Sequence, residues 1–173
     1  ASALGLILLE RGARPGVGEP SGGSPERMSW DAMMRHLAPD PRLQLGVALR
    51  ELGIATAMID ISDGLSTDLS HVLDESGVGA IIRGSSVPIA RCVESLAASA
   101  NLDSLELALH GGEEYELLFT ARPERKADIE ELANKVGTAI TTIGEVVTGR
   151  GIQLEREGKL EQMLARGFEH RIW

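Results

Sequence analysis

The chain has 173 residues, of which 43% are hydrophobic and 25% are charged, a composition typical of one folded domain or of one domain and part of another. The formal net charge is −9, with 26 acidic against 17 basic residues, so the composition argues against a nucleic-acid partner held by clustered Lys and Arg. Cys92 is the only cysteine, which excludes an internal disulfide and favours a reducing compartment such as the cytoplasm, and no apolar run is long enough to predict a membrane span.

The first 29 residues divide into an apolar segment and a loop. Ala1–Arg11 has apolar residues at helical spacing and predicts a helix. The chain does not begin with Met, so we expect this helix to be the end of an upstream, N-terminal domain. Gly12–Ser29 contains five glycines and three prolines and predicts a flexible loop. We therefore place a boundary between residues 1–29 and a C-terminal α/β domain over residues 30–173.

Within that domain, apolar runs predict strands and apolar residues three or four positions apart predict helices. The predicted strands are Ala55–Ile61, which we expect to be buried, Val78–Arg83, Tyr115–Ala121, Ala139–Val147 and Ile152–Arg156. The predicted helices are Trp30–Leu37, one capped by Asp40-Pro41 and ended near Gly53, Leu65–Glu75, Ala90–Ser99, Glu124–Val136 and Leu160–Arg166. Strands mixed with helices indicate an α/β or an α+β layer fold, of which we expect α+β, with helices packed on a mixed β-sheet.

The segment from Asp60 to Gly64, which reads DISDG, is the sharpest chemical feature of the sequence. It follows a predicted strand, and a turn at Ser62–Gly64 would bring Asp63 back towards Asp60. Two close carboxylates repel each other unless a cation lies between them, and Mg²⁺ takes a few oxygen ligands while it keeps several waters. The start of the next helix would also offer N–H groups to a phosphate.

An alternative interpretation gives this segment a structural role only. Asp63 or Ser62 would then cap the helix that starts at Leu65. Because this alternative leaves Asp60 unexplained at the end of a predicted strand, the metal site is favoured.

A second candidate lies at Gly111-Gly112-Glu113, before the predicted strand Tyr115–Ala121. A glycine pair permits a tight turn with exposed N–H groups, and Glu113 would lie at the mouth of that turn. The alternative is that the acids of this segment, including Glu114 and Glu116, form the solvent face of the strand. By composition alone, the alternative is preferred here.

Several segments together resemble the C-terminal part of the thiamine-monophosphate kinase family, within the superfamily of aminoimidazole ribonucleotide synthetase and selenophosphate synthetase. The segments are His36–Arg42, AMIDISDGL at 57–65, SGVGA at 76–80, GGEEYELLFT at 111–120 and GFEH at 167–170. The resemblance implies the C-terminal domain of the aminoimidazole ribonucleotide synthetase-like fold. It also implies phosphorylation of thiamine monophosphate to the diphosphate with ATP and Mg²⁺, in the cytoplasm.

The resemblance also implies roles for individual residues. Asp60 and Asp63 would be metal ligands, and Ser62 would contact the nucleotide. Glu113 would contact the thiamine part of the substrate, beside a wall shaped by Gly111 and Gly112. An aromatic residue near the C-terminus contacts substrate in this family, and the candidates here are Phe168 and Trp173.

Two positions depart from the family pattern, and one part of the expected machinery is absent. Position 114 is usually Asp and is Glu here, and Arg171 stands where the family often has Phe. No GxxxxGK[ST] phosphate loop occurs in the chain. The resemblance implies that an upstream domain holds most of the nucleotide site and the homodimer contact. Together with the missing loop, it leads us to expect little kinase activity from this chain alone.

Two other functions are compatible with the same residues. One is a sister synthetase of the superfamily, against which the GGEEYELLFT segment argues. The other is a non-catalytic binding domain that has kept the fold. A pure scaffold would need none of the acids Asp60, Asp63 and Glu113, so their presence argues against this function.

Overall fold

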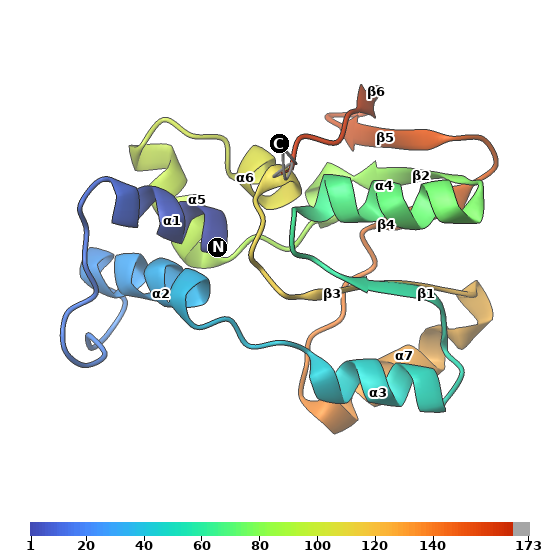
Figure 1. Cartoon of the computed structure of the whole chain (residues 1–173), viewed down its shortest axis with the longest axis horizontal. Helices are drawn as coiled ribbons and strands as arrows, with labels where there is room; N and C mark the ends of the chain where they lie inside the picture. Colours follow the sequence, from blue (N-terminus) through green and yellow to red (C-terminus); the bar gives the residue numbers. More distant parts are fainter. Residues whose placement is uncertain (168–173) are drawn as a thin grey trace, which may run out of the picture.

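The computed structural model describes residues 1–167, which form three hydrophobic clusters joined by short connections (Figure 1). One cluster is entirely helical. The second lies between a four-stranded sheet and the helices that cover it. The third lies between a two-stranded sheet and a further pair of helices. The segments 60–64 and 111–116, which the sequence analysis singled out, lie side by side between these clusters.

Four helices form the first group: α1 (Ser2–Glu10), α2 (Pro25–Leu37), α5 (Arg91–Ser99) and α6 (Ser104–His110). Leu4, Ala32, Cys92 and Val93 make up its buried core. Helices α1 and α2 cross so closely that a Cβ atom at Gly5 would lie 2.1 Å from the carbonyl oxygen of Ala32. Only glycine permits this crossing.

The second group contains a mixed sheet with strand order β4-β2-β5-β6, covered by α4 (Leu65–Ser76). Strands β2 and β5 are parallel, whereas β2–β4 and β5–β6 are antiparallel. The strands are β2 (Gly79–Arg83), β4 (Gly144–Val147), β5 (Gly151–Arg156) and β6 (Lys159–Met163). The leucines at 65, 69 and 73 of α4 recur at helical spacing and are all buried against the sheet. The predicted α+β class with a mixed sheet is confirmed.

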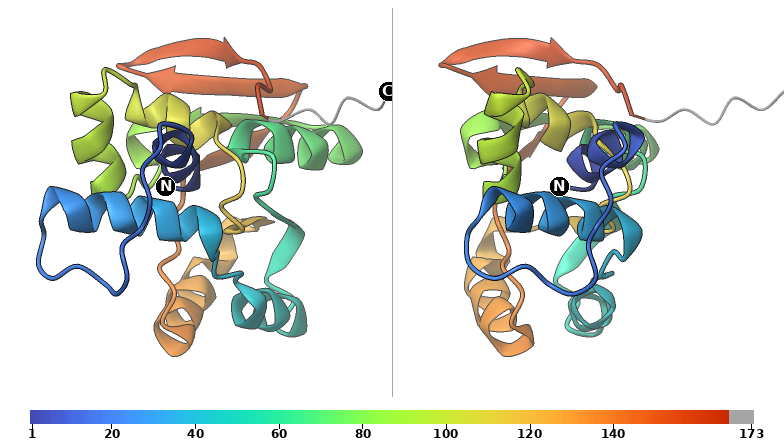
Figure 2. Two further views of the ribbon diagram at one scale, coloured as in Figure 1. Left: turned by 60° about the vertical axis from the view of Figure 1, so that its left-hand side comes forward. Right: turned by 90° about the vertical axis from the view of Figure 1, so that its left-hand side faces the viewer.

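In the third group, β1 (Ala55–Asp60) and β3 (Leu117–Ala121) form an antiparallel pair in which Asp60 lies opposite Leu117. Helices α3 (Leu43–Glu51) and α7 (Lys126–Val136) pack against this pair. Short 3₁₀ turns, η1 (Gly84–Ser86) and η2 (Pro123–Arg125), complete the described elements. Figure 2 shows α3 and α7 at one end of the molecule and the hairpin β5–β6 at the other.

The expectation that Ala55–Ile61 is a buried strand is wrong in its burial. Residues of β1 alternate between half-buried and exposed, and the side chain of Met58 remains 39% exposed. The reason is the size of the sheet: β1 has one partner strand, and helices cover one face only. The two-residue period of a half-exposed strand therefore replaces the continuous burial that we expected.

Several predicted boundaries also need correction. Helix α2 begins at Pro25, not at Trp30, because Ser24 caps it by accepting from the N–H of Arg27 and proline suits the first helical position. Asp40 does not cap α3, which begins at Leu43, and it pairs instead with the Arg42 side chain.

The remaining corrections concern the second half of the chain. The helix predicted over Leu160–Arg166 is absent from its described position, where β6 pairs with β5 after a turn at Glu157-Gly158. The strand predicted over Ala139–Val147 is shorter and begins at Gly144. Helix α6, capped by Asp103, was missed because seven residues show too little periodicity.

The proposed boundary between residues 29 and 30 lies inside α2, since that helix runs from Pro25 to Leu37 without interruption. Helix α1 packs against α2 and α6 and contributes Leu4 to the helical core. The assignment of α1 to an upstream domain stays a prediction. No helix among residues 1–167 combines the length and the apolar character that a membrane crossing requires.

The loop between α1 and α2, residues 11–24, extends away from the helices (Figure 2). A Cβ atom at Gly12, Gly16 or Gly18 would meet nothing within 4 Å, whereas Arg27 holds the later part of the loop through the carbonyl of Pro20. We predict that thermolysin, which cleaves before exposed aliphatic residues, cuts first before Val17. Val17→Gly should slow this first cut, and resistance of the wild-type loop would show that it is packed.

Candidate functional site

The first half of the candidate site is the turn that joins β1 to α4, residues 61–64. The strand ends at Asp60, whose side chain is exposed, and the helix begins at Leu65 after Gly64. Gly64 has φ +118°, a conformation that favours glycine. Ser62 and Asp63 lie in the turn and are half-buried. The turn therefore presents two carboxylates and a hydroxyl at one end of a strand.

The structure rejects the capping alternative for this turn. Helix α4 has Gly64 at its N-cap and no side-chain capping hydrogen bond. The ordering group comes from inside the helix: the Oδ2 atom of Asp68 accepts hydrogen bonds from the backbone N–H groups of Ser62, Asp63 and Gly64 at 3.0, 3.1 and 3.1 Å. The carboxylate of Asp63 is thus free of a capping role.

Asp68 is a residue of this site that the sequence analysis missed. It is 2% exposed, and burial raises the pKa of its carboxyl group above the usual value, although the three N–H donors partly oppose the shift. A signal was present in the sequence. Asp68 lies between Leu65 and Leu69 on the apolar face of the predicted helix, where a carboxylate requires polar partners.

The second half of the site is the segment from Gly111 to Glu116, which runs beside the turn. The N–H of Glu113 donates to the carbonyl of Ser62 at 2.7 Å, and the N–H of Tyr115 donates to the carbonyl of Ile61 at 2.9 Å. A Cβ atom at Gly112 would lie 2.4 Å from that same Ser62 oxygen. The two notable motifs of the sequence are therefore one structural unit.

The backbone of the second segment is held in an unusual conformation. Glu113 and Tyr115 have φ values of 63° and 50°, in the left-handed region that residues other than glycine rarely adopt. Such residues cost about 1 to 3 kcal/mol each and persist where their surroundings fix them. Here the two N–H donors to the neighbouring turn fix them.

Acidic side chains surround Tyr115, a second residue that the sequence analysis did not assign to the site. Its hydroxyl donates to Oε2 of Glu113 at 3.3 Å. The negative charge of Glu113 raises the pKa of Tyr115 most, followed by desolvation and this hydrogen bond, and the charges of Asp60 and Asp63 add to the shift. The charges of Asp60, Asp63 and Glu113, which come from both motifs, therefore all affect Tyr115.

The neighbouring acids of this segment are structural anchors, so the solvent-face interpretation of Glu114 and Glu116 is wrong. Oε1 of Glu114 accepts from the N–H of Ser2 at 2.7 Å, at the start of α1. Glu116 accepts two hydrogen bonds from Arg42, at 2.8 Å from Nε and 2.7 Å from Nη2. Each acid ties the segment to a different part of the chain.

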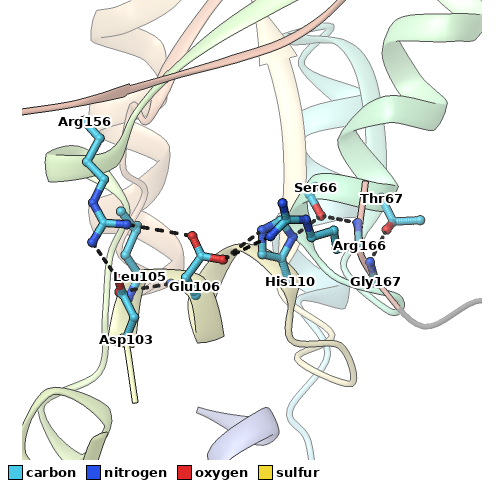
Figure 3. A network of polar contacts seen from close by, with 9 residues as sticks. All are labelled: Ser66, Thr67, Asp103, Leu105, Glu106, His110, Arg156, Arg166 and Gly167. Atoms are coloured by element: carbon cyan, nitrogen blue, oxygen red, sulfur yellow. Dashed lines mark hydrogen bonds and ion pairs between the residues drawn. The ribbon is translucent and has the colours of Figure 1, made fainter. Parts of the chain in front are cut away.

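A polar network holds the last described residues against the same end of α4 (Figure 3). The hydroxyl of Ser66 lies 2.8 Å from Nδ1 of His110, and the N–H of Gly167 donates to Oγ1 of Thr67 at 3.0 Å. Burial lowers the pKa of His110, which favours its neutral form, although the nearby charge of Glu106 partly opposes the shift. The expected substrate contacts Phe168 and Trp173 lie outside the described residues.

The donor set of the turn fits a hard divalent cation. Within residues 1–167, no three His, Cys, Asp or Glu side chains form a complete metal-binding group. Asp60 and Asp63 offer carboxylate oxygens at a partly exposed position. Mg²⁺ is commonly held by one or two carboxylates, with water and substrate phosphates as its other ligands, so these residue types are of the kind that it uses.

A hollow of about 790 Å³ lies along α2 and is separate from this site. It includes Arg27, Asp31 and Arg42, and no residue of the segments 60–64 and 111–116 lines it. Arg27 is paired with Asp31, and Arg42 is paired with Glu116. Because these charges already have partners, the chemistry of the motifs is a better guide to the site than the size of this hollow.

Comparison with known proteins confirms the family resemblance. Residues 22–157 match the family of the AIR synthase related protein, C-terminal domain. The thiamine-monophosphate kinase of Haemophilus influenzae is 37% identical over 140 residues, which are 79% of this chain and 42% of that protein.

Solved structures of thiamine-monophosphate kinases are also similar to this chain. The crystal structure of thiamine-monophosphate kinase from Stenotrophomonas maltophilia matches with a TM-score of 0.77 and 31% identity, over 91% of this chain and 48% of that one. The structure of AaThiL complexed with AMPPCP and TMP matches with a TM-score of 0.73 and 29% identity, over 96% of this chain and 47% of that one. The chain spans less than half the length of each of these proteins.

The contact between the turn and the second segment yields a prediction about Gly112. Gly112→Ala places a methyl group where it would lie 2.4 Å from the Ser62 oxygen, so the segments must separate. We expect a loss of about 1 to 3 kcal/mol in the free energy of unfolding, measured by urea denaturation. Gly23→Ala is the control, because a Cβ atom there meets nothing within 4 Å, and it should leave stability unchanged. Equal effects of the two substitutions would contradict the close contact.

Proposed function

The chain belongs to the family of the AIR synthase related protein, C-terminal domain, and from this premise we propose that it forms the C-terminal part of a thiamine-monophosphate kinase. The reaction is the phosphorylation of thiamine monophosphate to thiamine diphosphate by ATP with Mg²⁺. The observation that carries the proposal is the junction of the two motifs, where the Glu113 N–H bonds the Ser62 carbonyl. The AaThiL complex with AMPPCP and TMP supports the two substrates.

Each residue of the junction has a role in this proposal. Asp60 and Asp63 would hold Mg²⁺. The hydroxyl of Ser62, which lies between them in the sequence, would contact the nucleotide. Glu113 contacts the thiamine moiety from the opposite segment. Gly111 and Gly112 keep that side of the site free of side chains, so that the substrate can approach the backbone.

The proposed chemistry is direct in-line transfer. An oxygen of the thiamine monophosphate phosphate forms a bond to the γ-phosphorus of ATP while the bond from that phosphorus to the β,γ-bridging oxygen breaks, which gives ADP and thiamine diphosphate. Bound Mg²⁺ supplies charge neutralisation between the phosphates and the carboxylates. The task of this chain is positioning: Asp60 and Asp63 fix the cation position, and Glu113 orients the acceptor.

The proposal includes a second part of the protein. An upstream domain supplies most of the nucleotide site and the contact of a homodimer, since the chain matches about half the length of its relatives and contains no phosphate-cradling loop of the GxxxxGK[ST] type. A cytoplasmic location is also part of the proposal, because Cys92 has no second cysteine in this chain with which to form a disulfide.

A direct assay tests this function. The full-length protein that carries this chain should produce thiamine diphosphate and ADP in equal amounts from thiamine monophosphate and ATP, only with Mg²⁺ present. The 173-residue chain alone should produce almost none. Absence of product with the full-length protein, or equal turnover by the chain alone, would contradict the proposal.

The metal pair gives a sharper prediction in the same assay. Asp60→Asn removes a proposed ligand and should lower kcat/KM by about a hundredfold, which corresponds to ~3 kcal/mol of transition-state stabilisation. The same change removes repulsion from the cluster of acids around Tyr115, so the thermal midpoint without Mg²⁺ should stay equal or rise.

Asp74→Asn is the matched control, since Asp74 is an exposed acid on α4 away from the turn. It should leave turnover and the thermal midpoint unchanged. Normal turnover of Asp60→Asn, with a normal requirement for Mg²⁺, would rule out Asp60 as a metal ligand.

A further inference from the structure

The buried carboxylate of Asp68 contacts the backbone of the proposed metal-binding turn. It is 2% exposed, and a single oxygen, Oδ2, accepts the N–H groups of three successive residues. A buried carboxylate is costly unless it is fully hydrogen-bonded, and bonds to a charged acceptor are about twice as strong as neutral ones. The three N–H donors therefore stabilise the buried charge of Asp68.

This carboxylate orders the turn and does not cap the helix to which it belongs. Its three donors, Ser62, Asp63 and Gly64, all precede the first residue of α4. The helix begins independently, because the carbonyl of Gly64 accepts the N–H groups of Thr67 and Asp68. The bonds of Asp68 thus fix the backbone dihedral angles of a segment outside its own helix.

The same segment is held from its other side by the second motif. While the N–H of Ser62 points to Asp68, the carbonyl of Ser62 accepts the N–H of Glu113 at 2.7 Å. The backbone of the turn is therefore fixed on both sides, and the Ser62 and Asp63 side chains are left for a ligand. The N–H groups of Ser62, Asp63 and Gly64 are already occupied, so these three amides are not available to a phosphate. The expectation that the N–H groups at the start of the following helix bind a phosphate stays a prediction.

We propose that Asp68 is a positioning residue of the phosphoryl-transfer site. It holds the three amides of the turn so that Asp63 and Ser62 keep the geometry required to bind Mg²⁺ and nucleotide, while it contacts neither ligand itself. Phosphates then reach this turn through the cation and not through the backbone amides. This inference rests on the proposed kinase function for its catalytic consequence.

The first arm of the test measures the dependence of the rate on Mg²⁺ in the full-length protein. Asp68→Ala should raise the Mg²⁺ concentration for half-maximal rate by about tenfold or more, the usual effect of losing a group that orients a metal ligand. Asp68→Asn keeps one acceptor oxygen and should recover part of the wild-type value. Asp74→Ala, on the exposed side of the same helix, should change nothing.

The second arm needs no activity. Amide hydrogen exchange of a peptide that covers residues 61–64 should become at least about tenfold faster in Asp68→Ala, while exchange in β2 stays as in the wild type. If Asp68→Ala does not fold, Asp68→Asn carries both arms, with smaller shifts in the same direction.

The two arms separate the two proposals. If the wild type has no kinase activity but exchange responds as expected, the kinase function fails and the control of the turn by Asp68 stands. A variant that loses thermal stability and keeps the wild-type Mg²⁺ dependence would reduce Asp68 to a purely structural role and overturn the inference. Unchanged exchange at residues 61–64 would also overturn it.

Discussion

The close backbone contact between the turn at 61–64 and the segment at 111–116 is the constraint on which the rest of this structure depends. Peptide groups of the two segments bond directly, and Gly112 leaves no room for a side chain between them. Strand β1 ends there, and helix α4 begins there. The three hydrophobic clusters are therefore joined through a polar junction, which explains why the unusual backbone of Glu113 and Tyr115 is retained.

The junction concentrates negative charge in a chain that is already acidic. Asp60, Asp63 and Glu113 all raise the pKa of Tyr115, and the carboxyl group of Asp68 is buried behind them. Such an arrangement lowers the stability of the fold, since apolar or neutral residues would pack there at lower cost. Its presence therefore indicates that a function requires it. Under the proposed function, a divalent cation offsets the repulsion and brings phosphates to an acidic surface. The same charges would repel those phosphates if the cation were absent.

Sequence reasoning singled out the two segments that the structure brings together, but not the contacts that join them. The DISDG segment was readable because acids at the end of an apolar strand require an explanation, and the glycine pair before Glu113 predicted a tight turn. The joining of the two segments, 50 residues apart, is tertiary and leaves no local signal. The prediction of a helix over Leu160–Arg166 was wrong for a related reason, because the apolar residues of β6 also fit one helical turn. The predicted turn at Glu157-Gly158 was the better indication of a hairpin. Asp68 was readable from its place between two buried leucines, where an acid requires donors.

The longer acid at position 114 has a structural explanation in its contact with the start of α1. The resemblance has Asp at this position, which raised the question whether Glu alters the fit of the ligand. The Glu114 carboxylate accepts the N–H of Ser2 at the start of α1. Ser2 is itself fully buried, with its hydroxyl 3.0 Å from Nδ1 of His36, so the additional methylene of Glu114 reaches a fixed partner. Position 114 therefore ties the segment to the helical group, while the neighbouring Glu113 accepts from the hydroxyl of Tyr115.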